Sequence, residues 1–190
     1  MPGEDLAHVS HYYDEAHPYY GQEVTIVGAG SSAADAALDM YRTGARVTMV
    51  HRGDDFRHSL KYWIRPNLEN RVKEGSIVAH FRTRIEEIKE DAVIATKDGR
   101  RLTIPTDRVF LLTGYHAAGE LLDQVGAVTD EATLAAELDE QYQTSVPGLY
   151  CIGSAGFGRR TSDVFIENGL VHAEVAIADV ARKASARADA

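Results

Sequence analysis

The feature that most constrains the fold of this chain is a glycine-rich turn between an apolar segment and a run of small residues. Residues 24–27 are all β-branched and mostly apolar, and they are followed by Gly28-Ala29-Gly30-Ser31-Ser32-Ala33. A helical pattern then runs from Ser32 to Thr43, and Gly44 follows as a C-cap. A strand, a G-x-G-x-x-A turn and a helix in this order are typical of a dinucleotide-binding unit. A turn with a purely structural role is the alternative.

The residues of this turn have separate roles in such a unit. Gly28 allows the tight turn, Gly30 lets the backbone approach a pyrophosphate, and Ala33 keeps helix and strand close. The amides at the start of the helix, including those of Ser31 and Ser32, face the phosphates. We therefore predict that Gly28, Gly30, Ser31, Ser32 and Ala33 bind a dinucleotide.

The end of the second strand indicates which dinucleotide binds. An NAD site usually has an acidic residue about 20 residues past the glycines, but His51 and Arg52 occupy that place here. A guanidinium pairs with a 2′-phosphate through charged hydrogen bonds, whereas a carboxylate would repel it. Asp54 and Asp55 weaken the local positive field, and Arg57 restores it. The pattern favours NADPH, with solvated loop arginines as the alternative.

Composition and charge exclude several classes of protein. The 190 residues include 29 acidic and 20 basic side chains, for a net charge of −9. This charge argues against nucleic acid or an anionic membrane as the main partner. No signal peptide and no apolar run of about 18 residues is recognised. One cysteine, Cys151, excludes an intrachain disulfide and a C-x-x-C pair, so we expect a cytoplasmic protein.

Short apolar segments predict an α/β fold in the first part of the chain. Residues 59–75 have helical spacing that Pro66 interrupts, so we expect a helix that is broken or restarts there and ends at Gly75. Ile77-Val78 is expected to be the third parallel strand, and residues 85–104 an antiparallel β-meander. Residues 109–113 are another buried strand. The expected architecture is a Rossmann-like, three-layer NAD(P)-binding domain with a small antiparallel β-meander.

The last third of the sequence has a different pattern. Residues 118–125 and 131–138 are expected to be short helices, and residues 149–153 a strand that buries Cys151 as a structural thiol. From Ser162 onward, apolar residues recur every three or four positions and predict a final helix with one buried face. Residues 181–190 are expected to fray.

Three motifs carry a resemblance to a known family. They are His51-Arg52-x-x-x-Phe56-Arg57, Val109-x-x-x-Thr113-Gly114 and Thr144-Ser145-Val146-Pro147-Gly148-Leu149-Tyr150-x-x-Gly153. They resemble the two-dinucleotide-fold flavoprotein disulfide reductases of the low-molecular-weight thioredoxin-reductase type. The resemblance implies that residues 51, 52 and 57 bind the NADPH 2′-phosphate. It also implies that Thr113, Gly114, Tyr115, Gly153 and Ser154 contact the flavin.

Two positions depart from the family pattern. Gly53 stands where relatives often have a second arginine, which implies a weaker grip on the phosphate. Ser154 replaces the aspartate that usually contacts the ribityl chain of FAD.

Further stretches narrow the resemblance to the branch that contains the bacillithiol-disulfide (bacilliredoxin) reductases. They are residues 8–13, 15–21, 61–66 and 165–168. The resemblance implies FAD and NADPH as cofactors, without a C-x-x-C pair. It also implies a crossover linker at 1–20, an NADPH-binding domain at 21–113 and the C-terminal part of an FAD-binding domain at 114–190. The family's N-terminal FAD-binding unit, with its own glycine-rich turn, has no match, so we expect a portion of a larger reductase.

Two functions are therefore expected as alternatives. In the first, the chain is the NADPH-binding portion of an oxidoreductase that passes hydride to FAD and electrons to a bacillithiol-type disulfide or a redoxin. In the second, it is a non-catalytic NADPH-binding module that acts through a partner. Another chain that supplies the FAD domain and a homo-oligomer are the expected assemblies, and residues 1–190 alone are expected to retain no FAD. No catalytic residue is predicted, and His8, His11 and His17 match no metal-ligand spacing.

Overall fold

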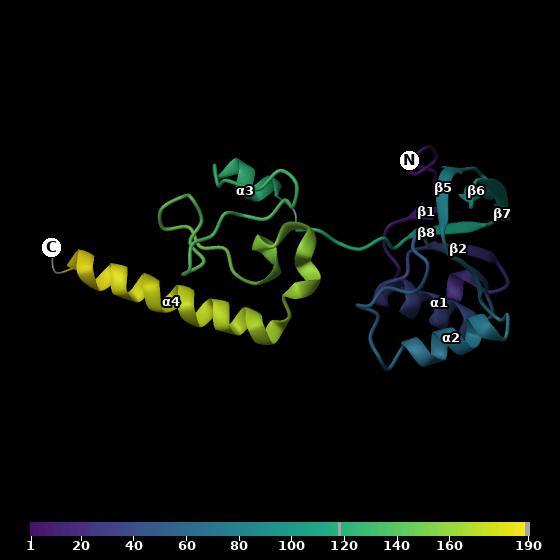
Figure 1. Ribbon diagram of the computed structural model, residues 1–190, viewed down its shortest axis with the longest axis horizontal. Coiled ribbons are helices and arrows are strands. Elements are labelled where there is room, and N and C mark those ends of the chain that lie inside the picture. The colour runs from purple at the N-terminus through teal and green to yellow at the C-terminus, as the bar shows by residue number, and fades with distance from the viewer. Residues whose placement is uncertain (118, 189–190) are drawn as a thin grey trace. The chain divides into compact units, whose positions relative to one another are not determined.

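The computed structural model describes residues 1–117 and 119–188, and it divides the chain into two compact units, Met1–Gly114 and Tyr115–Ala190 (Figure 1). The first unit is built on a parallel sheet with the strand order β1-β8-β2-β3-β4. Its strands are β1 (Val9–Ser10), β2 (Glu23–Val27), β3 (Arg46–Val50), β4 (Val78–His80) and β8 (Arg108–Leu111). The central strands β2 and β3 pair in register from Glu23↔Arg46 to Val27↔Val50.

Helix α1 (Ser31–Thr43) covers one face of this sheet through small side chains. Ala33, Ala34, Ala36 and Ala37 are all fully buried, so the helix packs closely on the strands. Gly44 ends the helix with a φ of 98°, a left-handed conformation that glycine adopts without strain. The predicted helix, its apolar face and its C-cap are confirmed.

Helix α2 (Arg65–Lys73) lies beside α1 and is shorter than the sequence predicted. Pro66 stands in its first turn, where a missing backbone N–H costs no hydrogen bond. The expectation of a helix that restarts at Pro66 is therefore confirmed, whereas residues 59–64 form turns.

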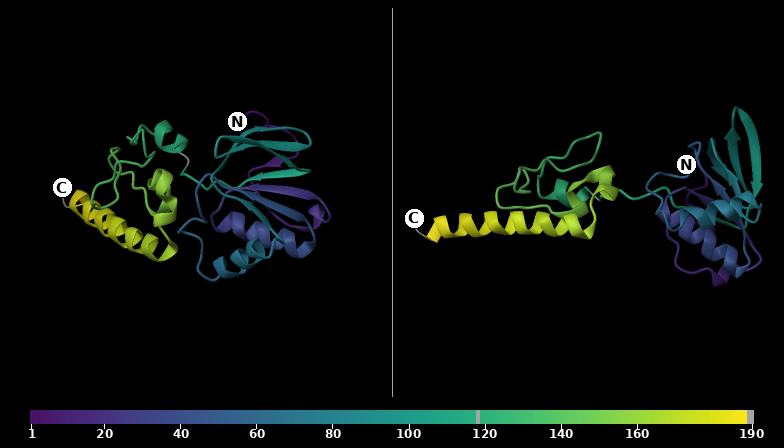
Figure 2. Two further views of the ribbon diagram at one scale, coloured as in Figure 1. Left: turned by 45° about the vertical axis from the view of Figure 1, so that its right-hand side comes forward. Right: turned by 60° about the horizontal axis from the view of Figure 1, so that its bottom comes forward.

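An antiparallel sheet covers the other face of the parallel sheet. It consists of β5 (Thr83–Ile88), β6 (Ala92–Lys97) and β7 (Arg100–Pro105). Ile88, Val93 and Ile104 of this sheet form one buried cluster with residues 50, 109 and 111 of the parallel sheet. Helices, parallel sheet and meander are the three layers that the sequence predicted, and two further views show them in Figure 2.

The N-terminal residues belong to the first unit, which the sequence did not predict. Strand β1 pairs with β8 through Val9↔Val109 and Ser10↔Phe110. The 3-10 helix η1 (His17–Tyr19) follows, and the Tyr19 ring packs edge-on against Phe110, 5.2 Å between centroids.

The second unit contains little regular structure before its last helix. It comprises α3 (Glu120–Gln124), two 3-10 helices, η2 (Gly153–Gly156) and η3 (Gly158–Asp163), and α4 (Ile166–Ala188). Its small core includes Leu122, Ala127 and Cys151, so the expectation of a buried Cys151 is confirmed. The helix predicted at 118–125 is present as α3, although residue 118 lies outside the described residues.

Three expectations for the second unit are wrong. Residues 131–138 form a turn rather than a helix, because the Asp130 carboxylate accepts the N–H of Thr133 at 2.6 Å and Leu134 has a φ of 59°. Residues 149–153 make one isolated bridge, Gln143↔Tyr150, and no strand. The last helix begins at Ile166 and continues through the expected frayed tail to Ala188, and it buries residues 172, 176 and 179 while the apolar residues 166, 170, 177 and 180 are exposed. None of the helices within the described residues has the length and hydropathy that crossing a bilayer requires.

Candidate functional site

The glycine turn between β2 and α1 is the centre of the candidate site. Gly28 has a φ of 145°, and a Cβ there would lie 2.2 Å from the carbonyl oxygen of Leu112. The N–H of Gly28 also donates to the carbonyl of Val50 at 3.0 Å. Gly28 is therefore required by the fold, since the chain leaves no room for a side chain.

Gly30 differs from Gly28 because the fold does not need it. Its φ is −90°, and the nearest atom to a Cβ there would be Arg57 Cδ at 3.8 Å, an ordinary contact. The missing side chain leaves open the approach to the N-terminus of α1. The first intrahelical bond runs from the Ala34 N–H to the Gly30 carbonyl at 3.0 Å, so the amides of residues 31–33 precede it. An open glycine followed by these amides fits a phosphate group.

The chain after β3 folds back onto this turn. The N–H of Arg57 donates to the Ala29 carbonyl at 3.1 Å. The Ser31 hydroxyl donates to the Ser59 carbonyl at 3.4 Å and accepts the Lys61 N–H at 3.3 Å. Phe56 is buried beside Phe81, with the ring centroids 5.0 Å apart. Residues 56–61 therefore form one side of the site.

Aromatic side chains continue from this loop. Tyr62 and Trp63 pack edge to face, 4.9 Å between centroids, and the Lys61 ammonium lies 5.5 Å from the Trp63 ring. Trp63 is 62% exposed and is the only tryptophan of the sequence.

His51 and Arg52 lie at the end of β3, as the sequence predicted. The His51 N–H donates to the His80 carbonyl at 2.9 Å. Partial burial and the charges of Arg52 and Arg57 lower the pKa of His51. A Cβ at position 53 would lie 2.7 Å from His51 Nε2, so a second arginine there would have to displace the imidazole.

Arg52 and Arg57 are both exposed, and no described residue forms a hydrogen bond or an ion pair with either guanidinium. Asp55, in contrast, forms an ion pair with Arg65 at 3.3 Å. The pKa of Asp55 is lowered by the hydrogen bond that it accepts from the Phe56 N–H and, to a lesser degree, by Arg65. The Arg65 charge therefore offsets that of Asp55, and the two other arginines remain available to an anion.

Arg65 is a positioning residue that the sequence analysis missed. Its guanidinium donates to the carbonyls of Phe56 and Arg57, both at 3.1 Å, and to Glu69 at 2.9 Å. One side chain thus fixes the backbone that carries Arg57. The only signal in the sequence is an arginine four residues before a glutamate at a helix start, which also occurs in ordinary helices.

The expected flavin residues belong to both units. Thr113 and Gly114 follow β8 and are exposed, and Gly114 has a φ of 109°. Tyr115, Gly153 and Ser154 belong to the second unit, where Gly153 begins η2 with a φ of 66°. The structure does not relate the two groups to one another.

His172 of α4 positions the Gly153 turn, and the sequence analysis did not predict this role. Its Nδ1 accepts the Gly153 N–H at 3.3 Å. Its ring stacks between Tyr142 and Phe157, with centroid distances of 4.2 and 5.6 Å. A lone histidine in a helical pattern carries no sequence signal for such a role.

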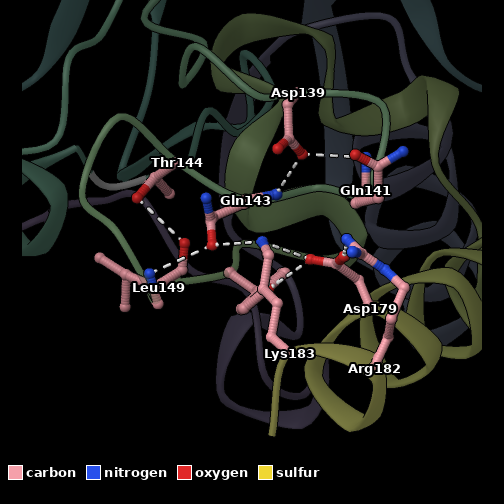
Figure 3. Close-up of polar contacts among 10 residues, drawn as sticks. Asp139, Gln141, Gln143, Thr144, Leu149, Asp179, Arg182 and Lys183 are labelled. Carbon is pink, nitrogen blue, oxygen red and sulfur yellow. Dashed lines mark hydrogen bonds and ion pairs between the residues drawn. The ribbon is translucent and has the colours of Figure 1, made fainter. Parts of the chain in front are cut away.

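A buried carboxylate connects α4 with the preceding loops (Figure 3). The Tyr150 hydroxyl donates to Asp179 at 2.6 Å, and Lys183 Nζ pairs with Asp179 at 2.5 Å. Lys183 also donates to Gln143 at 2.9 Å, and Arg182 forms a further ion pair with Asp179. Because Tyr150, Lys183 and Arg182 all engage the Asp179 carboxylate, this cluster supports the fold rather than a reaction.

Comparisons with known proteins show to which family the chain is similar. The family model described as pyridine nucleotide-disulphide oxidoreductase matches residues 1–153. Bacilliredoxin reductase Bdr of Bacillus subtilis (strain 168) is 37% identical over 185 residues, covering 96% of this chain and 57% of that protein.

Solved structures of reductases are also similar to this chain. Bacillithiol disulfide reductase Bdr from Bacillus cereus superposes with a TM-score of 0.92 at 37% identity, over 96% of this chain and 57% of that one. Thioredoxin reductase of Lactococcus lactis shares the fold, with a TM-score of 0.71 at 24% identity, over 93% of this chain and 61% of that one. This chain therefore spans little more than half the length of these relatives. With four fifths of its sequence matched by the family model, it belongs to the pyridine nucleotide-disulphide oxidoreductase family.

Proposed function

We propose that this chain is the NADPH-binding portion of a flavoprotein disulfide reductase. The observation that carries the proposal is the combination of two features of the first unit. Gly30 leaves open the approach to the α1 amides, and Arg52 stands at the end of β3 where an NAD site has a carboxylate. The first feature suits the pyrophosphate that all dinucleotides share, and the second suits the 2′-phosphate of NADPH.

The binding residues would each have a defined task. Gly28, Gly30 and the amides of residues 31–33 hold the pyrophosphate, and His51 with Arg52 receives the 2′-phosphate. When bound, NADPH supplies a hydride. The residues of the chain orient the dinucleotide, and the missing side chain of Gly28 lets the carbonyl of Leu112, at the end of β8, lie close to the turn.

The substrate and the partners follow from the relatives by analogy. Bdr is named for bacilliredoxin and bacillithiol disulfide, and we propose a bacillithiol-type disulfide or a redoxin as the electron acceptor. FAD would bind where a flavin-binding β-α-β unit is supplied in the same polypeptide or by a partner chain. Thr113, Gly114, Tyr115, Gly153 and Ser154 would then contact it. A homo-oligomer in the cytoplasm is the proposed state, and the single cysteine is consistent with a reducing compartment.

Cofactor preference tests the proposal directly. Residues 1–190 should bind NADPH more tightly than NADH in calorimetric titrations. A hydrogen bond to a charged group contributes about 1.5–3 kcal/mol. Arg52→Ala should therefore weaken NADPH binding about 10- to 150-fold and leave NADH binding nearly unchanged.

Arg101→Ala is the matched control, because Arg101 is an exposed arginine of the antiparallel sheet. It removes the same charge and should change neither titration. Equal affinity of the unsubstituted chain for the two nucleotides would contradict the proposed preference.

A further inference from the structure

The imidazole of His172 contacts both ends of the 3-10 helix η2. Its Nδ1 accepts the N–H of Gly153, the first residue of η2, at 3.3 Å. One face of the ring stacks on Phe157, the residue that caps the other end of η2. Gly169 lies one turn before His172 on α4, and its Cβ position is 3.8 Å from the Cα of Gly153. Helix α4 therefore approaches η2 closely, and His172 links the two.

This hydrogen bond defines the protonation state of the ring. A ring nitrogen that accepts an N–H carries no proton, so His172 is neutral, with its proton on Nε2. A protonated imidazole donates from both nitrogens, and its Nδ1–H would face the Gly153 N–H. A 180° flip of the ring keeps its plane between Tyr142 and Phe157 but replaces Nδ1 by a carbon. Protonation therefore deprives the Gly153 N–H of its partner in either case.

The groups around the ring keep their charge in the range in which histidines titrate, about pH 5 to 8. The phenol that stacks on the ring, Tyr142, is of a type that stays neutral there. Burial raises the pKa of the Cys151 thiol, so it too stays neutral. Carboxylates and guanidinium groups stay charged. Those of the surrounding elements are Asp139, Glu140, Arg159, Arg160, Asp163, Glu167, Glu174 and Asp179.

We infer that His172 is a pH-dependent positioning residue for the Gly153 turn: the neutral ring holds η2 in place, and protonation releases it. The inference rests on the proposed function, in which Gly153 and Ser154 of η2 contact the flavin. Because only the neutral ring accepts the Gly153 N–H, the turn is held at high pH and released as the pH falls through the histidine range. Flavin contact at this turn would therefore weaken in mild acid.

Nuclear magnetic resonance of the full chain tests the inference without flavin. Isotope-labelled glycine and histidine report the Gly153 amide and the His172 ring in one sample, titrated from about pH 8 to 5. As the ring is protonated, the Gly153 amide should shift and lose about two- to tenfold of its protection from hydrogen exchange, with the same midpoint. This range lies above the pH, near 4, at which carboxyl groups of the unfolded chain are protonated.

Variants separate the hydrogen bond from the stack. His172→Asn keeps an acceptor near the place of Nδ1 that does not titrate, so the Gly153 amide should stay protected over the whole range. His172→Phe keeps the aromatic stack without an acceptor, so the amide should be unprotected throughout. His116→Phe is the matched control, because it removes the exposed histidine of the same unit and should leave the transition unchanged. Circular dichroism checks that each variant is folded.

The outcomes distinguish this inference from the proposed function. A Gly153 amide that stays protected while the His172 ring titrates would overturn the inference, as would a ring that stays neutral down to the lowest pH. A pH-dependent transition that persists in His172→Phe would also overturn it. Because the measurement needs no cofactor, failure of flavin or NADPH to bind would overturn the proposed function and leave the response of the turn to pH in place.

Discussion

At the scale of single residues, the two glycines of one motif are glycines for different reasons. Gly28 is enclosed by the protein, because its φ and the Leu112 carbonyl both exclude a side chain. Gly30 has an ordinary conformation and room for a Cβ. Folding therefore requires glycine at position 28, whereas glycine at position 30 is required by the ligand that approaches the turn.

Substitution of each glycine should separate these requirements. Gly28→Ala should lower the free energy of unfolding by about 3 kcal/mol, from backbone strain and overlap with a backbone oxygen. Gly30→Ala should stay within about 1 kcal/mol of the unsubstituted chain. Denaturant unfolding followed by circular dichroism measures both.

The larger variant Gly30→Val tests the same point in binding. It should remain folded and lose affinity for NADPH and NADH together, because its methyl groups occupy the path of the pyrophosphate. A folded Gly30→Val that binds as the unsubstituted chain does would mean that residues 28–33 are only a structural turn.

At the scale of elements, α4 depends on one buried charge. Hydrogen bonds from Lys183 and Tyr150, followed by Arg182, hold the pKa of Asp179 well below its usual range. A carboxyl whose pKa is lower in the folded state stabilises that state above its unfolded pKa, near 4, and this contribution is lost as the pH falls through the folded pKa. The attachment of α4 is therefore sensitive to acid.

Asp179→Asn should lower the thermal stability of the second unit at pH 7. The gap between this variant and the unsubstituted chain should narrow as the pH falls below about 4, where the carboxyl group begins to be protonated in the unfolded chain. Melting curves from far-ultraviolet circular dichroism at several pH values measure it, with Glu174→Gln on the exposed side of α4 as the control. A gap that stays constant from pH 7 to pH 3 would rule out a charged Asp179 as the anchor.

At the scale of the whole molecule, the proposed NADPH site lies in only one of the two units. Every residue proposed to hold NADPH lies within Met1–Gly114. A fragment of residues 1–114 should therefore fold and bind NADPH within about twofold of the full chain. Calorimetry on both lengths measures this, and a loss of affinity well beyond twofold would show that residues 115–190 contribute to the site.

Local patterns predicted most of the first unit, whereas long-range contacts escaped prediction. The glycine turn, the buried face of α1 and the meander are encoded in consecutive residues. The pairing of Val9 with Val109 joins two distant segments, and nothing in either segment alone predicts it. In the second unit, residues 131–138 have helical spacing but form a turn, because the Asp130 side chain stabilises the turn.

The candidate site follows the same rule. His51 and Arg52 were predicted from their distance to the glycines, and Arg57 from the charges that surround them. Arg65 and His172 act through backbone groups that are remote in sequence, which no residue pattern reports.

The exposed position of Trp63 has a practical consequence for spectroscopy. The indole is two residues from Lys61, whose N–H is bonded to the first helical residue of the glycine turn, Ser31. Indole emission overlaps the absorption band of a reduced nicotinamide, and this chain has a single indole. A reduced dinucleotide on the turn would accept its excitation energy. Trp63 is thus an intrinsic fluorescence donor beside the proposed binding site. Occupancy of the site can be followed by the quenching of its fluorescence, without an added label.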